Sequence, residues 1–168
     1  MLPQIAVEIF AFGHILSAMA WLGGGILTMF ILGPNVRKLS PNAALEFNSK
    51  VVPKVARFIG GAIGATFIFG LLLLYSLYSG DFSALSGTST GMYIEAGVVC
   101  GLLAAVVGGA MTFPAFAKIA RLSGEALEKA QPPSPDMAKY AGRARIGALV
   151  GTILLLAALA MMVAAGFG

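Results

Sequence analysis

Residues 58–78 read FIGGAIGATFIFGLLLLYSLY and contain no charged side chain. Three further apolar runs occupy residues 5–32, 93–117 and 146–167. An α-helix needs roughly 20 residues to cross the hydrocarbon core of a bilayer, which is about 30 Å thick. The chain is 58% hydrophobic and only 11% charged, so it has too little polar surface for a water-soluble globule. The four runs therefore predict an all-α integral membrane four-helix bundle that forms one transmembrane domain over residues 1–168.

The composition of the runs argues against the other membrane architectures. None of them shows the apolar–polar alternation that is typical of strands in a membrane barrel. No basic region precedes the first run, so we expect a membrane helix there rather than a cleaved signal peptide.

The positions of the basic residues predict the orientation in the membrane. All eleven Lys and Arg residues lie in or beside the first and third connections. The second connection, residues 79–92, contains Asp81 and no basic residue. By the positive-inside rule, the first and third connections are cytoplasmic and both termini lie on the outer side of the membrane. We expect this membrane to be the plasma (inner) membrane. The basic residues would then face anionic lipid head groups of the bilayer, and no nucleic-acid partner is expected.

Small residues predict how the helices associate. They recur at four-residue spacing in Gly60/Gly64, Gly97/Gly101, Ala105/Gly109 and Gly147/Gly151. Such pairs let helix backbones approach closely in lipid, so they predict a tightly packed bundle. The same faces would serve a homo-oligomer or a non-catalytic accessory subunit of a larger membrane complex.

The two halves of the chain show a weak internal similarity. A shift of about 84 to 87 residues places Thr28 on Thr112 and Arg37 on Arg121. This register predicts two parallel hairpins related by an axis along the membrane normal. Chance similarity between Gly-rich apolar helices is the alternative explanation.

His14 in the first run is the only histidine of the protein. An ionisable residue inside a membrane helix is by default a candidate functional residue. Ser17, Trp21 and Gly25 follow it at helical spacing on one face, where an aromatic wall and small residues suit a flat cofactor such as haem b. His14 would then be the axial metal ligand. The same pattern also suits a structural histidine that is bonded to a neighbouring carbonyl or hydroxyl group.

Copper is the alternative metal for the same region. Glu8 and Glu95 each lie near the outer end of a predicted span, where they could form a cation or proton path with His14. Copper would also favour thioether ligands, for which the nearby candidates are Met19, Met92 and Met111.

The residues His14, Trp21, Gly23 and Gly24, followed by an apolar run and a basic connection, resemble the start of the copper-resistance-D-like membrane proteins. That group includes the HemJ-type protoporphyrinogen oxidases. The resemblance implies a small bundle that binds b-type haem through His14 for redox chemistry or electron transfer, or that handles copper. The chain departs from bis-histidine ligation because the predicted repeat places Val98 opposite His14. The second ligand would then be absent, a Met, or His14 of a second protomer.

Overall fold

The computed structural model describes residues 4–79, 81, 83, 85 and 87–167. The secondary structure of these residues is helical, with no strand among them, which confirms the all-α prediction. Within the described residues, four helical segments are long and apolar enough to cross a membrane, as predicted: Gln4–Val36, Pro41–Tyr78, Ser89–Glu128 and Asp136–Gly166.

The first half of the chain is a helical hairpin. It consists of α1 (Gln4–Ile26), the π-helical turn η1 (Leu27–Leu32), α2 (Gly33–Val36), α3 (Pro41–Lys50) and α4 (Val52–Tyr78). The helix α3 begins at Pro41, directly after Ser40. Proline suits the first helical position because its backbone angle is fixed and it lacks only an N–H that would be unpaired there.

The second half of the chain is also a helical hairpin. It consists of α5 (Ser89–Val107), the π-helical turn η3 (Gly108–Thr112), α6 (Phe113–Glu128) and α7 (Asp136–Phe167). The Thr88 hydroxyl caps α5 by accepting a hydrogen bond from the Gly91 N–H at 3.0 Å.

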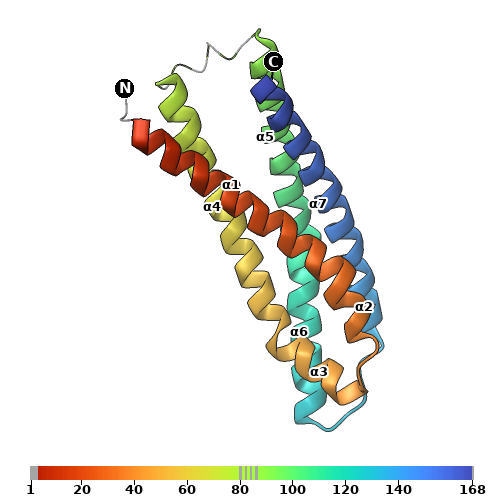
Figure 1. Ribbon diagram of the computed structural model, residues 1–168. Helices are drawn as coiled ribbons and strands as arrows, with labels where there is room; N and C mark the ends of the chain where they lie inside the picture. The colour runs from red at the N-terminus through yellow and green to blue at the C-terminus, as the bar shows by residue number, and fades with distance from the viewer. Residues whose placement is uncertain (1–3, 80, 82, 84, 86, 168) are drawn as a thin grey trace.

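The hairpins are packed as two pairs, α1 with α4 and α5 with α7. Figure 1 shows α1 running diagonally across the bundle, and the two pairs diverging toward the end that carries both termini. At the opposite end, α3 packs against α6. The basic residues of the first and third connections lie at this α3 end, which is called the basic end below.

Helices at the basic end continue beyond the predicted spans. The third segment stays helical to Glu128, whereas its apolar run ends at residue 117. Hydropathy does not detect this extension because α6 is amphipathic, with a stripe of buried residues that includes Ala115, Ile119 and Ser123. That stripe explains why α6 remains helical where it packs against α3.

Each π-helical turn ends two residues before a proline. Proline lacks an N–H and its ring clashes with the carbonyl four residues earlier. In these wider turns an N–H donates to the carbonyl five residues earlier instead of four. The Gly33 N–H donates to the Thr28 carbonyl, and the Phe113 N–H donates to the Gly108 carbonyl. Pro34 and Pro114 stand 80 positions apart, which differs from the predicted repeat register, and the repeat stays a prediction.

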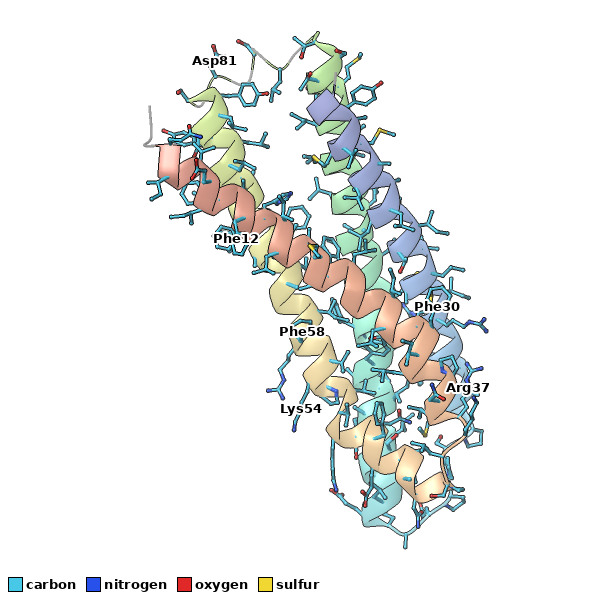
Figure 2. The ribbon with its side chains drawn as sticks, in the orientation of Figure 1. Phe12, Phe30, Arg37, Lys54, Phe58 and Asp81 are labelled. Carbon is cyan, nitrogen blue, oxygen red and sulfur yellow. The ribbon has the colours of Figure 1, made fainter. Side chains whose placement is uncertain are left out.

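The buried core is small and lies where the four long helices meet. It contains Trp21, Ile59, Ala62 and Ala104. Large apolar side chains on the outside of the bundle are widely exposed, as Phe12 illustrates with 68% of its surface accessible (Figure 2). A surface of this kind requires an apolar solvent, which supports contact with the lipid bilayer.

The small-residue pairs behave differently from one another. A methyl group added at Gly147 would lie 2.6 Å from the Thr112 hydroxyl oxygen, so this glycine does permit close packing. Among the described residues, a methyl group at Gly60, Gly64, Gly101 or Gly109 would have no heavy atom within 4 Å beyond its own helix backbone and chain neighbours. The prediction of tight packing inside the bundle is therefore wrong for these four glycines, because no other described part of the chain lies against them.

Candidate functional site

The side chain of His14 in α1 forms a hydrogen bond with the backbone of α4. Its Nδ1 atom lies 2.9 Å from the backbone carbonyl oxygen of Thr66, and the side chain is half-buried. One turn further along α4, a methyl group at Gly70 would lie 2.9 Å from Nδ1 and 3.0 Å from Cε1 of the imidazole. Only a glycine leaves the ring this close to the helix backbone.

The bond to Thr66 determines the tautomer of a neutral His14. A carbonyl oxygen only accepts hydrogen bonds, so Nδ1 must carry the proton and donate it. The lone pair is then on Nε2, which is the atom that remains available as a ligand. Metal-binding histidines in proteins are commonly held in this way, with the other ring nitrogen donating to a backbone carbonyl.

Ser17 is buried and uses its hydroxyl within α1. The Oγ atom donates to the carbonyl oxygens of Gly13 at 2.7 Å and His14 at 3.1 Å, as alternative or shared acceptors. Such local bonds satisfy a hydroxyl in an apolar helix without any partner from another element. Ser17 therefore lies beside His14 in the chain but presents no free donor to a ligand.

Trp21 and Gly25 lie deeper, on the same inward face of α1. Trp21 is 6% exposed, and its ring centroid is 6.1 Å from that of Phe67 with the planes tilted by 52°. A methyl group at Gly25 would contact the Thr152 hydroxyl of α7 at 3.7 Å. The four predicted residues thus share one face, yet His14 contacts α4 whereas Gly25 faces α7.

Trp21 and Gly25 line a cavity of about 50 Å³ that His14 does not line. Pockets for small molecules usually have volumes of roughly 300–1,000 Å³, so a porphyrin does not fit in this space. The imidazole of His14 has the donor chemistry of an axial ligand, but Trp21 and Gly25 do not form a cradle for the macrocycle in this packing.

Three threonines that the sequence did not single out as ligands surround the small cavity. They are Thr28 in η1, Thr112 in η3 and Thr152 in α7. Thr28 donates to the Gly24 carbonyl at 2.7 Å, whereas the buried Thr112 Oγ1 has no hydrogen-bond partner in the part of the chain that the structure describes. The prolines that follow both π-helical turns were the available sequence signal for an irregular backbone here.

The carboxylates do not gather around His14. Among the described residues, no group of three or more His, Cys, Asp or Glu side chains is arranged to hold a metal ion. Glu8 instead accepts a hydrogen bond from the Gln4 amide at 3.2 Å. The structure therefore does not bring Glu8, Glu95 and His14 together as a cluster.

Asp81, in the connection between α4 and α5, is fixed by its own turn. The Ser83 hydroxyl and the Ser83 N–H donate to its Oδ1 atom at 2.5 and 3.1 Å. These bonds stabilise the charged form and hold the pKa of Asp81 below its ordinary value. The carboxylate is exposed and remains ionised at neutral pH.

Comparisons with protein-family models, with curated proteins and with solved structures find no match to this chain.

Proposed function

We propose that this protein binds haem b through the Nε2 atom of His14 and serves a redox or electron-transfer role in the membrane. The observation that supports the proposal most directly is the contact of 2.9 Å between Nδ1 and the Thr66 carbonyl oxygen. It leaves Nε2 with a lone pair and restricts the rotation of the ring, which are two properties of axial histidine ligands.

The residues around the imidazole would have distinct roles. The Thr66 carbonyl would orient the ring and increase the basicity of Nε2. Gly70 would leave space for the ring against α4. Bound haem would supply one-electron chemistry, with a potential that depends on its axial ligands and on the polarity of its surroundings.

The macrocycle would lie on the accessible side of His14 and not in the Trp21 cavity, which is too small. His14 is half-buried and belongs to α1, whose beginning lies at the diverging ends of the hairpins (Figure 1). With a single histidine per chain, the second axial position would be open, taken by a Met, or filled by His14 of a second protomer.

In the membrane, the proposed orientation follows from charge. The protein would span the plasma (inner) membrane with its basic end on the cytoplasmic side, and His14 would lie in the outer half of the bilayer. The open glycines Gly60 and Gly64 on α4 would allow association with a second copy or with a larger membrane complex.

The test is the visible absorption spectrum of the detergent-purified protein after expression with sufficient haem. We expect a Soret band and sharp bands of reduced haem in the wild type, and their loss in His14→Ala. Thr66→Val is the matched control, because it removes only the hydroxyl bond to the Ala62 carbonyl and keeps the Thr66 carbonyl in the backbone.

A colourless wild-type protein, or a His14→Ala protein with an unchanged spectrum, would contradict haem ligation by His14. Copper handling is the alternative for a colourless protein. It would be supported by copper that co-purifies with the wild type and is absent from His14→Ala. A protein that carries neither group but co-purifies stably with larger subunits would support an accessory role.

A further inference from the structure

A second cavity, of about 610 Å³, lies near the basic end and is separate from His14. It is lined by residues of both hairpins, including residues of α3 and α6. Most of its wall is apolar, with side chains such as Met29, Phe47, Ile119 and Leu149. Its volume falls within the range of roughly 300–1,000 Å³ that is typical of ligand pockets.

Two cations from distant parts of the chain line this cavity. Arg37 follows α2, and Arg145 belongs to α7. Neither arginine forms an ion pair among the described residues, and no acidic residue lines the cavity. The neighbouring Arg143 is directed elsewhere, since its Nη2 atom donates to the Ala110 carbonyl at 2.8 Å.

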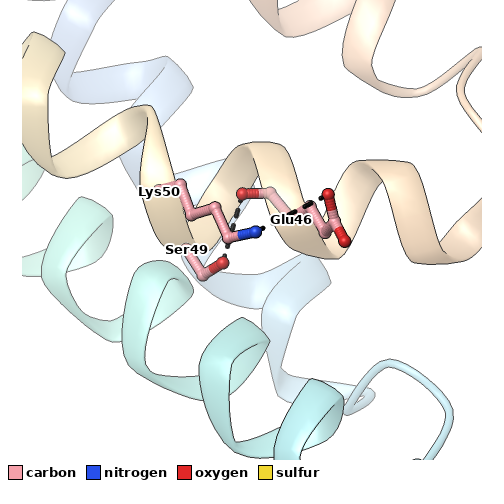
Figure 3. Close-up of polar contacts among 3 residues, drawn as sticks. All are labelled: Glu46, Ser49 and Lys50. Carbon is pink, nitrogen blue, oxygen red and sulfur yellow. Dashed lines mark hydrogen bonds and ion pairs between the residues drawn. The ribbon is translucent and has the colours of Figure 1, made fainter.

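Two of the acidic residues near this end have basic partners of their own. Glu46 of α3 pairs with Lys50 at 3.8 Å, and Ser49 donates to the Glu46 carbonyl (Figure 3). On α6, Glu125 pairs with Arg121. An anion bound between Arg37 and Arg145 would therefore not be displaced by these two carboxylates.

The combination of an apolar wall and two arginines indicates an amphiphile. A small soluble anion would leave the apolar wall uncovered, and a lipid with no net charge would leave one or both guanidinium groups without a counter-charge. An arginine presents a planar set of N–H donors that matches the oxygens of a phosphate. The cavity lies at the basic end of the bundle, where anionic head groups would be concentrated by charge.

We propose that this cavity binds one anionic phospholipid, with an acyl chain against the apolar wall and the headgroup phosphate between Arg37 and Arg145. The lipid would fill the space between the first hairpin and α7 and would connect the two halves of the molecule. The proposal does not depend on haem binding, because His14, its hydrogen-bond partner Thr66 and the adjacent Gly70 are not among the residues that line this cavity.

The experiment measures binding of phosphatidylglycerol and of phosphatidylcholine with the same acyl chains to the full-length protein in detergent, by native mass spectrometry. Arg37→Gln/Arg145→Gln is the test variant. Lys54→Gln/Arg57→Gln is its control, because it removes the same charge from the same end without altering the lining, and Figure 2 shows Lys54 on the opposite side of the bundle from Arg37.

We expect the wild type to prefer phosphatidylglycerol. At about 1 kcal/mol per basic residue, loss of the two arginines weakens its binding by about thirtyfold. The control variant is expected to change binding by less than about threefold, because its basic residues are not in the cavity. Ala141→Phe, which places a larger side chain on the apolar wall, is expected to weaken binding of both lipids.

Equal losses in the two charge variants, or equal binding of the two lipids by the wild type, would overturn the proposal. So would unchanged binding in a folded Ala141→Phe protein. Complete displacement of phosphatidylglycerol by millimolar inorganic phosphate would identify a site for a free anion instead. Loss of a haem spectrum in Arg37→Gln/Arg145→Gln, with retention in His14→Ala, would show that a porphyrin occupies this cavity and would contradict both proposals.

Discussion

Gly70→Ala is expected to displace the imidazole of His14 and destabilise the protein. The added Cβ would lie 2.9 Å from Nδ1, so the ring must move away from the Thr66 carbonyl. Overpacking costs about 1–3 kcal/mol, and the lost hydrogen bond adds about 0.5–1.5 kcal/mol. Replacing Gly with Ala in a helix returns about 1 kcal/mol. The expected net decrease in the free energy of unfolding is about 2 kcal/mol.

Gly64→Ala on the same helix is the matched control. Among the described residues, a methyl group there would meet no atom within 4 Å beyond its own helix backbone and chain neighbours, so this variant gains helix propensity without a clash. We expect Gly70→Ala to be less stable than Gly64→Ala by about 3 kcal/mol. The assay is unfolding in mixed micelles with increasing denaturing detergent, followed by the fluorescence of Trp21, the only tryptophan.

A double-mutant cycle assigns the effect to the imidazole. In a His14→Ala background there is no ring for the new methyl group to meet, so Gly70→Ala should cost no more than Gly64→Ala. If Gly70→Ala is as stable as Gly64→Ala, or if its cost persists without the imidazole, the close contact between His14 and Gly70 is wrong.

Three further changes test the loop, the glycine packing and the core. Ser83→Ala removes one donor to Asp81, so the pKa of Asp81 should rise toward its ordinary value in an NMR titration of the carboxyl carbon. Because the folded state lowers this pKa, ionised Asp81 stabilises the folded protein at pH values above the pKa of the unfolded chain. This stabilisation is lost as the pH falls through the pKa of the folded protein. Gly147→Ala should lower the free energy of unfolding by about 1–3 kcal/mol, whereas Gly151→Ala, with only an ordinary contact at 3.9 Å, should not lower it. Trp21→Ala should lower it by about 3–5 kcal/mol by circular dichroism, and a loss below about 1 kcal/mol would contradict its place in the core.

The helices could be predicted because hydropathy in a membrane protein is a local property. A run of apolar residues such as 58–78 has to satisfy its backbone internally, and a helix does so without reference to the rest of the chain. The pairing of small residues could not be predicted in the same way. Gly60/Gly64 and Gly147/Gly151 have the same spacing, but only the rotation of each helix in the bundle decides which pair meets a neighbour.

The candidate site shows the same division. A lone histidine in an apolar helix already indicates a functional residue, and its inward face follows from the spacing of Ser17 and Trp21. The hydrogen-bond acceptor of the imidazole could not be predicted, because Thr66 lies 52 positions away and contributes a backbone carbonyl that any residue would supply. The same limit applies to Arg37 and Arg145, which line one cavity only because the two hairpins are packed together.

The bond between His14 and Thr66 is compatible with a structural histidine as well as with a ligand, and His14→Asn separates the two roles. The asparagine amide nitrogen can take the place of Nδ1 and donate to the Thr66 carbonyl, but asparagine has no atom equivalent to Nε2. If Nε2 ligates haem, His14→Asn should unfold within about 1 kcal/mol of the wild type, whereas its haem spectrum should be lost. A haem spectrum that survives in His14→Asn would exclude Nε2 as the ligand. A protein as unstable as His14→Ala would instead show that the hydrogen bond to Thr66 is not what the imidazole contributes to the fold.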